Sequence, residues 1–285
     1  MKVIIFGGSG YLGSNIAKIF LRRNIKVTIF DTRTNEIKGP NIKFIKGNIS
    51  DFKKVLKATR GHNYVLNFAG ISDIGESIKK PIGTVQTNIL GTVNTLEASK
   101  ILKIKKYLFA SSIYVSSSQG SFYRTSKHSS ELYIHEYKKR FNLNYTIIRY
   151  GSIYGHNADK RNGIAKILFN FKRKRKLEYG GTKKAVRNFI YIDDACKSTA
   201  DLLKKKFDNK IVNITGKKSI KVSYIMKYLK ENLQINSHKI TYKNKPQLGH
   251  YDRNPFSYVA PKSIHYFRKD LVSIDKGLRK IIKNF

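Results

Sequence analysis

Along the first 150 residues, short and mainly hydrophobic runs alternate with longer stretches in which hydrophobic residues recur about every 3.6 positions. The runs lie at residues 2–6, 26–30, 42–45, 64–68, 107–110 and 145–149, and the periodic stretches at 12–23, 52–59, 81–100 and from 123 onward. Continuous runs are typical of strands buried on both faces, and periodic stretches are typical of helices that bury one face. This alternation predicts a doubly wound α/β fold, with a parallel sheet between two layers of helices.

After residue 155 the alternation becomes less regular and lysines become more frequent. Helical patterns continue at residues 163–173, 194–205, 223–232 and 274–284, and strand-like runs lie within 187–192 and near 211–214. We therefore expect a larger domain over residues 1–155 and a smaller, partly interleaved substrate-binding lobe over residues 156–285.

The turn after the first strand reads Gly7-Gly-Ser-Gly-Tyr-Leu-Gly13, and the second strand closes on Asp31. Glycines permit a tight turn and a close approach of the backbone to a pyrophosphate, while the N-terminus of the next helix supplies N–H groups. A carboxylate after the second strand can accept hydrogen bonds from ribose hydroxyls and repels a 2′-phosphate. This order predicts a Rossmann dinucleotide-binding unit that takes NAD, although the nearby Arg33 would suit the extra phosphate of NADP.

Ligands of such sheets bind beyond the carboxyl ends of the strands. Four groups of candidate residues stand at the predicted ends, namely Asp31, Asn48, residues 68–70, and the pair Ser111 and Ser112. We expect the functional site at this edge of the sheet.

The candidate chemistry lies just after the strand that ends at Ser112. A helical pattern there carries Tyr123 and Lys127 four residues apart, so both side chains project from one face. A nearby ammonium is expected to lower the pKa of a phenol, which could then take a proton from a substrate alcohol as a hydride leaves. Tyr-x-x-x-Lys alone is common, and an ordinary amphipathic helix is the alternative reading.

Composition adds a strong positive charge, because 57 Lys+Arg stand against 18 Asp+Glu, for a formal net charge of +39. Such an excess attracts anions, including nucleotides, acidic polysaccharides, anionic lipids and nucleic acids. The lysines are spread over the whole chain, with one dense run at residues 172–176. We expect this run at the solvated end of a helix, and a contact with a polyanion or a membrane surface is its alternative role.

Other features suggest a cytoplasmic protein without a metal site. Cys196 is the sole cysteine, the N-terminus leads directly into a strand, and no hydrophobic run approaches the ~20 residues that span a bilayer. The seven histidines show no metal-ligand spacing and are expected at the surface.

Together these motifs resemble the extended short-chain dehydrogenases/reductases, in particular the nucleotide-sugar epimerase and dehydratase branch, over nearly the whole chain. The matching stretches are Gly7–Gly13, Asp31, Gly47–Asp51, Asn67–Gly70, Asn88–Gly91, Ser111-Ser112, Tyr123-x-x-x-Lys127, Arg149-Tyr150 and Arg187–Asp194. The resemblance implies an N-terminal lobe that binds NAD or NADP and a C-terminal lobe that binds a nucleoside-diphosphate sugar. It also implies a homodimer, formed through the helices after Pro81 and Tyr123.

The resemblance assigns roles by position. Tyr123 would be the base, Lys127 would orient it and hold the nicotinamide ribose, and Ser112 would position the sugar alcohol. The cofactor-binding residues would be Gly7, Gly10, Tyr11, Leu12, Gly13, Asp31, Asn48, Ile49, Phe68, Ala69, Gly70, Asn88, Tyr123, Lys127 and Tyr150. The substrate-binding residues would be Ser112, Tyr114, Ser152 and Arg187, of which Arg187 would grip the diphosphate.

Departures from the family pattern narrow the reaction. Dehydratases of this branch carry an acid pair directly after the catalytic hydroxyl, where this chain has Ile113 and Tyr114. We therefore expect NAD-dependent 4-epimerisation of a nucleoside-diphosphate sugar through a 4-keto intermediate, in carbohydrate biosynthesis. The alternatives are a 4-dehydrogenase or 4-ketoreductase, and a nucleic-acid-binding or polyanion-binding member of the superfamily. The segment between Ser112 and Tyr123 is short, which predicts an open sugar pocket that would also permit release of the ketone.

Overall fold

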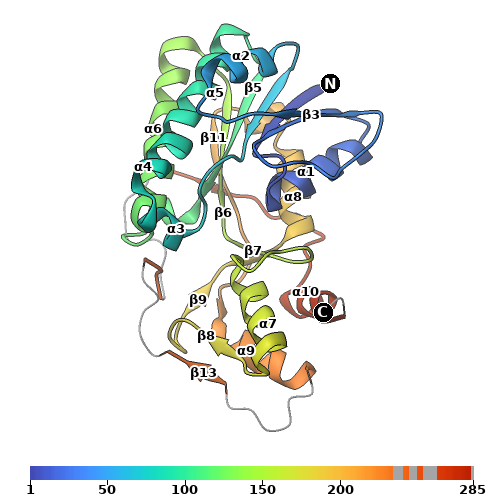
Figure 1. Cartoon of the computed structure of the whole chain (residues 1–285), viewed down its shortest axis with the longest axis vertical. Coiled ribbons are helices and arrows are strands. Elements are labelled where there is room, and N and C mark those ends of the chain that lie inside the picture. The colour runs from blue at the N-terminus through green and yellow to red at the C-terminus, as the bar shows by residue number, and fades with distance from the viewer. Residues whose placement is uncertain (234–239, 244–248, 253–261, 284–285) are drawn as a thin grey trace.

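The computed structural model describes residues 1–233, 240–243, 249–252 and 262–283. Its upper part in Figure 1 contains an eight-stranded sheet, in which every neighbouring pair of strands is parallel. In spatial order the strands are β14 (Ile264–His265), β11 (Lys210–Ile214), β6 (Tyr145–Tyr150), β5 (Lys106–Ser112), β4 (Tyr64–Asn67), β1 (Lys2–Phe6), β2 (Lys26–Asp31) and β3 (Ile42–Lys46). The direction of winding reverses between β1 and β4, so the predicted doubly wound α/β fold is confirmed.

Helices cover both faces of the sheet (Figure 1). On one face α1 (Tyr11–Arg22) packs against α8 (Ile192–Asp201), and on the other α2 (Phe52–Thr59), α5 (Gly91–Ile101) and α6 (Ser121–Phe141) lie side by side. The buried side chains divide accordingly into two apolar clusters, one that includes Phe20 of α1 and one that includes Val55 of α2. The central strand β1 is therefore buried on both faces, which explains its continuous apolar run.

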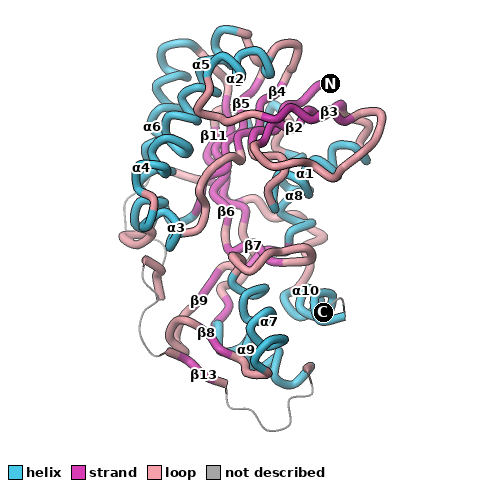
Figure 2. Tube along the Cα trace, viewed as in Figure 1, coloured by secondary structure: helices cyan, strands magenta, loops and turns pink. Residues whose placement is uncertain are grey.

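The lower part of Figure 2 is built from helices and three short strand pairs. The pairs are β7 (Ser152–Tyr154) with β10 (Phe189–Tyr191), β9 (Val186–Arg187) with β12 (Ile220–Lys221), and β8 (Glu178–Tyr179) with β13 (Thr241–Tyr242). The accompanying helices are α7 (Gly163–Lys174), α9 (Val222–Asn232) and α10 (Ile274–Lys283). The run predicted within 187–192 is divided between β9 and β10, while α8, β11 and β14 return to the upper part.

The helix predicted over residues 81–100 is interrupted by a wider turn. It consists of α4 (Pro81–Thr84), the π-helical turn η1 (Val85–Leu90) and α5. The carbonyl of Asn88, within η1, accepts hydrogen bonds from the hydroxyls of Thr92 (2.6 Å) and Ser130 (2.9 Å). Such turns are rare and often occur at functional sites. Three further short helices, α3 (Ile74–Lys79), η2 (Ile113–Ser116) and η3 (Lys205–Phe207), were not predicted.

Candidate active site

The glycine turn after β1 lies directly against the N-terminus of α1. Gly7 has a φ of +76°, and a Cβ there would lie 2.5 Å from the Ala69 nitrogen. A Cβ on Gly13 would lie 2.4 Å from the Gly7 carbonyl oxygen, so neither position accepts a side chain. Gly10 begins α1 without a side-chain cap. The first N–H groups of the helix are thus left for an anion, as the predicted pyrophosphate site requires.

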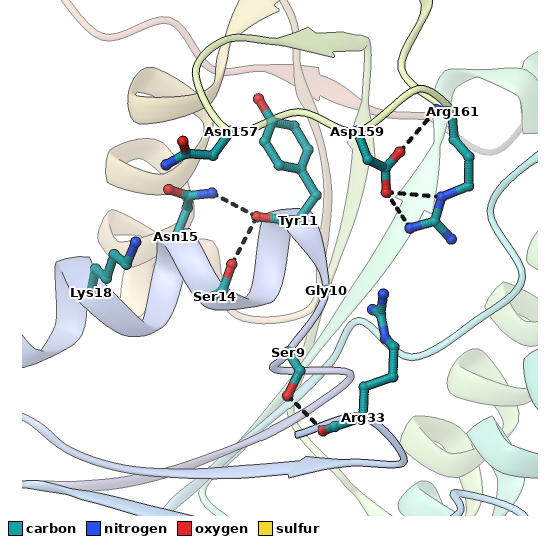
Figure 3. Close-up of a pocket in the computed structure, with 10 residues that line it drawn as sticks. All are labelled: Ser9, Gly10, Tyr11, Ser14, Asn15, Lys18, Arg33, Asn157, Asp159 and Arg161. Carbon is teal, nitrogen blue, oxygen red and sulfur yellow. Dashed lines mark hydrogen bonds and ion pairs between the residues drawn. The ribbon is translucent and has the colours of Figure 1, made fainter. Parts of the chain in front are cut away.

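A cavity of about 180 Å³ adjoins this end of α1 (Figure 3). Its lining residues are Ser9, Gly10, Tyr11, Ser14, Asn15, Lys18, Arg33, Asn157, Asp159 and Arg161. In Figure 3 the side chain of Arg33 points toward Asp159 and Arg161, which form an ion pair with Arg161 Nε 2.9 Å from Asp159 Oδ2. The positive end of α1 and the cationic side chains both favour a phosphate-bearing ligand here.

Asp31 ends β2 and ties two loops together. Its Oδ2 accepts a hydrogen bond from the Ser9 amide (3.0 Å), and its Oδ1 accepts one from the Arg33 amide (3.0 Å). The Arg33 Nε lies 3.9 Å from the same Oδ1. The carboxylate therefore stands at the glycine turn with capacity for further hydrogen bonds, which fits a ribose diol.

Two more predicted cofactor residues follow β3. The side chain of Asn48 is exposed, and its Oδ1 accepts a hydrogen bond from the Ser50 amide (3.0 Å). Ile49 is buried, and its carbonyl accepts a hydrogen bond from Asn94 Nδ2 (3.0 Å). This loop is thus held by α5, with Asn48 turned to solvent.

Asn88 holds the loop after β4, which carries the predicted cofactor residues Phe68, Ala69 and Gly70. Its Oδ1 accepts a hydrogen bond from the Ile71 amide (2.8 Å), and its Nδ2 donates to the Ile71 carbonyl (3.0 Å) and to Ser126 Oγ (2.9 Å). These contacts use both donors of the Asn88 amide within the protein. Asn88 therefore shapes the loop that lines the site, and its contact with the cofactor stays a prediction.

Ser112, Tyr123 and Lys127 meet at the carboxyl end of β5. Ser112 is the last residue of the strand, and its hydroxyl is hydrogen-bonded to the phenol of Tyr123. Lys127 lies one turn further along α6, is 5% exposed, and donates from Nζ to the Ala110 carbonyl (2.8 Å). Three residues chosen from the sequence are thus brought together at one strand end.

The protonation of these residues differs from the expectation. Burial raises the pKa of Tyr123, and the hydrogen bond with Ser112 opposes this only in part. Burial also lowers the pKa of Lys127 to about 8, against the opposing charge of Glu131. The pKa of Tyr123 is thus raised where the sequence predicted a lowered one, because desolvation of the buried phenol outweighs what favours the phenolate.

A buried ion pair beside Lys127 was missed by the sequence reasoning. Arg149 Nη2 lies 2.6 Å from Glu131 Oε2 and its Nε donates to Oε1 (3.0 Å), with both side chains 1% exposed. Ser111 Oγ also donates to Glu131 Oε1 (2.5 Å). The signal was present, since Glu131 stands four residues after Lys127 on the same helix face. The pair fixes α6 against the ends of β5 and β6.

Two of the predicted substrate residues, Arg187 and Ser152, lie next to Tyr251. Arg187 is 7% exposed, and its Nη1 donates to the carbonyls of Val186 (2.8 Å) and Tyr251 (2.6 Å). Its guanidinium also lies 4.5 Å from the centre of the Tyr251 ring, beside Ser152. Part of the hydrogen-bonding capacity of Arg187 is thus used within the protein.

Tyr150 points into the core beneath α8. It is 5% exposed, and its hydroxyl is hydrogen-bonded to Thr199 Oγ1 (2.6 Å). Its hydroxyl is therefore occupied by α8, so a contact with nicotinamide would have to come from another part of the residue.

Several histidines are not surface residues, contrary to expectation. His62, His135 and His250 are half-buried, and burial lowers the pKa of each, to about 4 for His250. His250 Nδ1 lies 2.7 Å from the hydroxyl of Tyr114. His238 lies outside the described residues. Within the described part of the chain, no three His, Cys, Asp or Glu side chains gather as metal ligands, and no helix is long and apolar enough to cross a membrane.

A model of the NAD-dependent epimerase/dehydratase family matches residues 3–215, which include the glycine turn, Asp31 and the three residues at the end of β5. This chain belongs to that family. The predicted resemblance is thereby confirmed, and with it an NAD-dependent enzyme of the extended short-chain dehydrogenase/reductase type. The glycine turn and the Asp31 carboxylate, which fit a dinucleotide, lie within the matched residues.

Similar proteins extend over nearly the whole chain. A Methanocaldococcus jannaschii protein, itself named provisionally as a UDP-glucose 4-epimerase, is 25% identical over 98% of this chain and 97% of its own length. A dTDP-D-glucose 4,6-dehydratase of Dictyostelium discoideum is 29% identical over 75% of this chain and 58% of its own length. The solved UDP-glucose 4-epimerase of Thermotoga maritima with UDP-glucose has a TM-score of 0.85, at 24% identity, over 99% of this chain and 98% of that one. That last likeness concerns the fold.

Proposed function

We propose that this enzyme interconverts two nucleoside-diphosphate hexoses that differ at C4, through a 4-keto intermediate. The observation that carries the proposal is the hydrogen-bonded pair Ser112 and Tyr123 with the buried Lys127 one helical turn away. Ile113 and Tyr114 follow Ser112 in place of the acid pair that loss of water would require. The similarity to a provisional UDP-glucose 4-epimerase over nearly the whole chain points to the same reaction.

The roles of the residues follow from their contacts. Tyr123 takes the proton of the C4 hydroxyl, directly or through Ser112, and returns it to the oxygen when the sugar is reduced again. Lys127 is close to 95% buried, so its ammonium acts with little screening and favours the phenolate at the moment it forms. Bound NAD supplies the acceptor and then the donor of the C4 hydride. The keto sugar must present its other face before reduction for the configuration to invert.

The binding of the cofactor rests on residues that are already in position. Asp31 would hold the adenosine ribose and the N-terminus of α1 the pyrophosphate. Ser152 and Arg187, next to Tyr251, are proposed to contact the diphosphate of the sugar nucleotide.

The test is incubation of the purified enzyme and of Ser112→Ala with UDP-, GDP- and CDP-hexoses, with both the product sugar and NADH absorbance followed. We expect the wild type to form the C4 epimer of one of these sugars with no net NADH. Ser219→Ala removes a hydroxyl whose only described contact is with Asn188, and should leave turnover unchanged. Net NADH with a free ketone and no epimer would instead establish a 4-dehydrogenase.

A further inference from the structure

Residues 249–252 cross from the lower part of the molecule toward the catalytic residues, and Figure 2 shows this short stretch beneath α3. At one end the Asp252 carbonyl accepts a hydrogen bond from the Val186 amide (2.7 Å), and its carboxylate accepts one from Thr182 Oγ1 (2.9 Å). The Tyr251 carbonyl accepts a hydrogen bond from Arg187 (2.6 Å). The stretch is therefore anchored to β9 and the turn before it.

The other end of the stretch contacts the upper part. Gly249 has a φ of +75°, and a Cβ there would lie 2.7 Å from Ile74 Cγ2 of α3. His250 Nδ1 lies 2.7 Å from the hydroxyl of Tyr114, which belongs to η2. One side-chain hydrogen bond thus joins the two parts of the molecule, between residues that are 136 positions apart.

Tyr114 is in direct contact with the catalytic residues. Its amide donates to Ser112 Oγ (3.3 Å), and its ring meets the Tyr123 ring edge to face with 6.4 Å between the centres. On its other side its ring packs against Tyr251 (4.9 Å) and His250 (5.8 Å). The short segment after Ser112 is therefore covered here by aromatic side chains from the lower part, where the sequence predicted an open pocket.

Both partners of the hydrogen bond are neutral near pH 7. Burial lowers the pKa of His250, the charges of Arg187 and Lys166 add to this and that of Asp73 opposes it, so that the pKa is about 4. Burial also raises the pKa of Tyr114. One proton therefore joins the phenol oxygen and Nδ1, donated by whichever partner the imidazole tautomer allows. A neutral hydrogen bond has a small net stability, so it can open and close during turnover.

We propose that the Tyr114–His250 hydrogen bond keeps the oxidised sugar on the enzyme between loss and return of the hydride. The proposal rests on the proposed 4-epimerase reaction. Inversion at C4 requires the ketone to turn over within the site without leaving it. The Tyr114–His250 hydrogen bond bridges the upper and lower parts of the molecule, next to the catalytic residues. It closes the site where the short segment between Ser112 and Tyr123 would leave it open. Tyr114 and His250 are thus positioning residues that determine whether the ketone is reduced or released.

The experiment measures how much ketone and NADH are released per epimer formed, in the wild type, Tyr114→Phe, His250→Phe and the double variant. Each single change removes one partner and keeps a ring, so release should rise about 2- to 10-fold, the worth of one neutral hydrogen bond. Release of ketone and NADH by the double variant should equal that of the single variants, because all three lose the same hydrogen bond. Tyr224→Phe removes a phenol contact with Asp275 at the surface and should change nothing. An unchanged ratio in both single variants would overturn the proposal.

A wild type that neither epimerises nor oxidises any nucleoside-diphosphate hexose would refute the proposed function. In that case, whether the Tyr114–His250 hydrogen bond holds the two segments together is tested by amide hydrogen exchange of the NAD-loaded protein at residues 113–117 and 249–252. Faster exchange in both segments of Tyr114→Phe and His250→Phe would support the bridge, and unchanged exchange would overturn it.

Discussion

Burial decides the protonation of the individual catalytic residues. Lys127 is one helical turn from Glu131, yet desolvation outweighs that favourable charge and lowers the pKa of the lysine to about 8. The same effect keeps the Tyr123 phenol protonated in this structure. The buried ammonium of Lys127 therefore destabilises the folded state. In the proposed reaction, the same charge stabilises the phenolate of Tyr123.

Replacing Lys127 with Met should abolish turnover and stabilise the fold at pH 7. The folded pKa is about 8 against an ordinary value of 10.5, which corresponds to on the order of 3 kcal/mol against the folded state at pH 7. Loss of the hydrogen bond to Ala110 offsets about 1 kcal/mol of the gain. The free energy of unfolding, from urea titrations, gives the net difference.

The difference in free energy of unfolding that favours Lys127→Met over the wild type should shrink as the pH rises from about 8 toward 10.5. Over this range the folded lysine has lost its proton while the unfolded lysine still holds one, so the wild type gains stability. An advantage that grows over this range would contradict the assigned cause.

At the scale of elements, the π turn η1 joins the cofactor loop to α6 through Asn88. Asn88→Ala would leave the part-buried amide and carbonyl of Ile71 without their partner. We expect a loss of at least about 2 kcal/mol in the free energy of unfolding, together with weaker NAD binding measured by calorimetry. Asn232→Ala, on the exposed end of α9, should change stability by less than about 0.5 kcal/mol. Equal effects of the two substitutions would contradict the assigned role.

Elements with strong local patterns could be predicted from the sequence. Most residues of the strands from β1 to β6 are apolar, and Tyr123 and Lys127 follow β5 at a helical spacing. The fold class and the residues at that strand end could therefore be predicted. The π turn was not, because it arises from contacts of Asn88 with Ile71 and Ser130 that leave no periodic signal.

Long-range side-chain contacts and their electrostatics also leave no local signal. The Tyr114–His250 contact joins two distant segments, and the raised phenol pKa depends on how much chain covers Tyr123. Both follow from tertiary packing, which the spacing of residues along the chain does not specify.

At the scale of the whole molecule, α4, η1 and α6 pack together at one edge of the molecule (Figure 1), and we take the exposed hydrophobic side chains of these helices and of α5 as one apolar face. Its exposed hydrophobic side chains are Ile82, Val85, Leu90, Ile101, Leu132, Tyr133 and Phe141. We propose that this face forms the expected homodimer. Sedimentation should give twice 32.8 kDa for the wild type and the monomer mass for Leu132→Glu. Phe169→Glu, on α7, should remain dimeric, and a wild type that sediments as a monomer at every concentration would refute the dimer.

The positive charge is the other property of the whole molecule. Residues 172–176 are exposed at the end of α7, where Lys174 pairs with Glu178 at 3.6 Å and Arg175 stacks on Phe171. We expect binding to RNA or heparin to be weak and diffuse. Neutralising this run should then weaken it no more than neutralising five exposed lysines elsewhere, Lys204, Lys205, Lys206, Lys217 and Lys218. A salt dependence that collapses only with the run at 172–176 would show a dedicated polyanion site.

The most direct test of the account is the turnover of Tyr123→Phe on the hexose that the wild type epimerises. The change keeps the ring and removes the hydroxyl that is hydrogen-bonded to Ser112. Turnover should fall about 10²- to 10⁴-fold, the usual worth of a positioned acid–base group. Tyr224→Phe, which removes an exposed phenol on α9, is the control and should match the wild type. Turnover of Tyr123→Phe as fast as that of the wild type would contradict the site assignment.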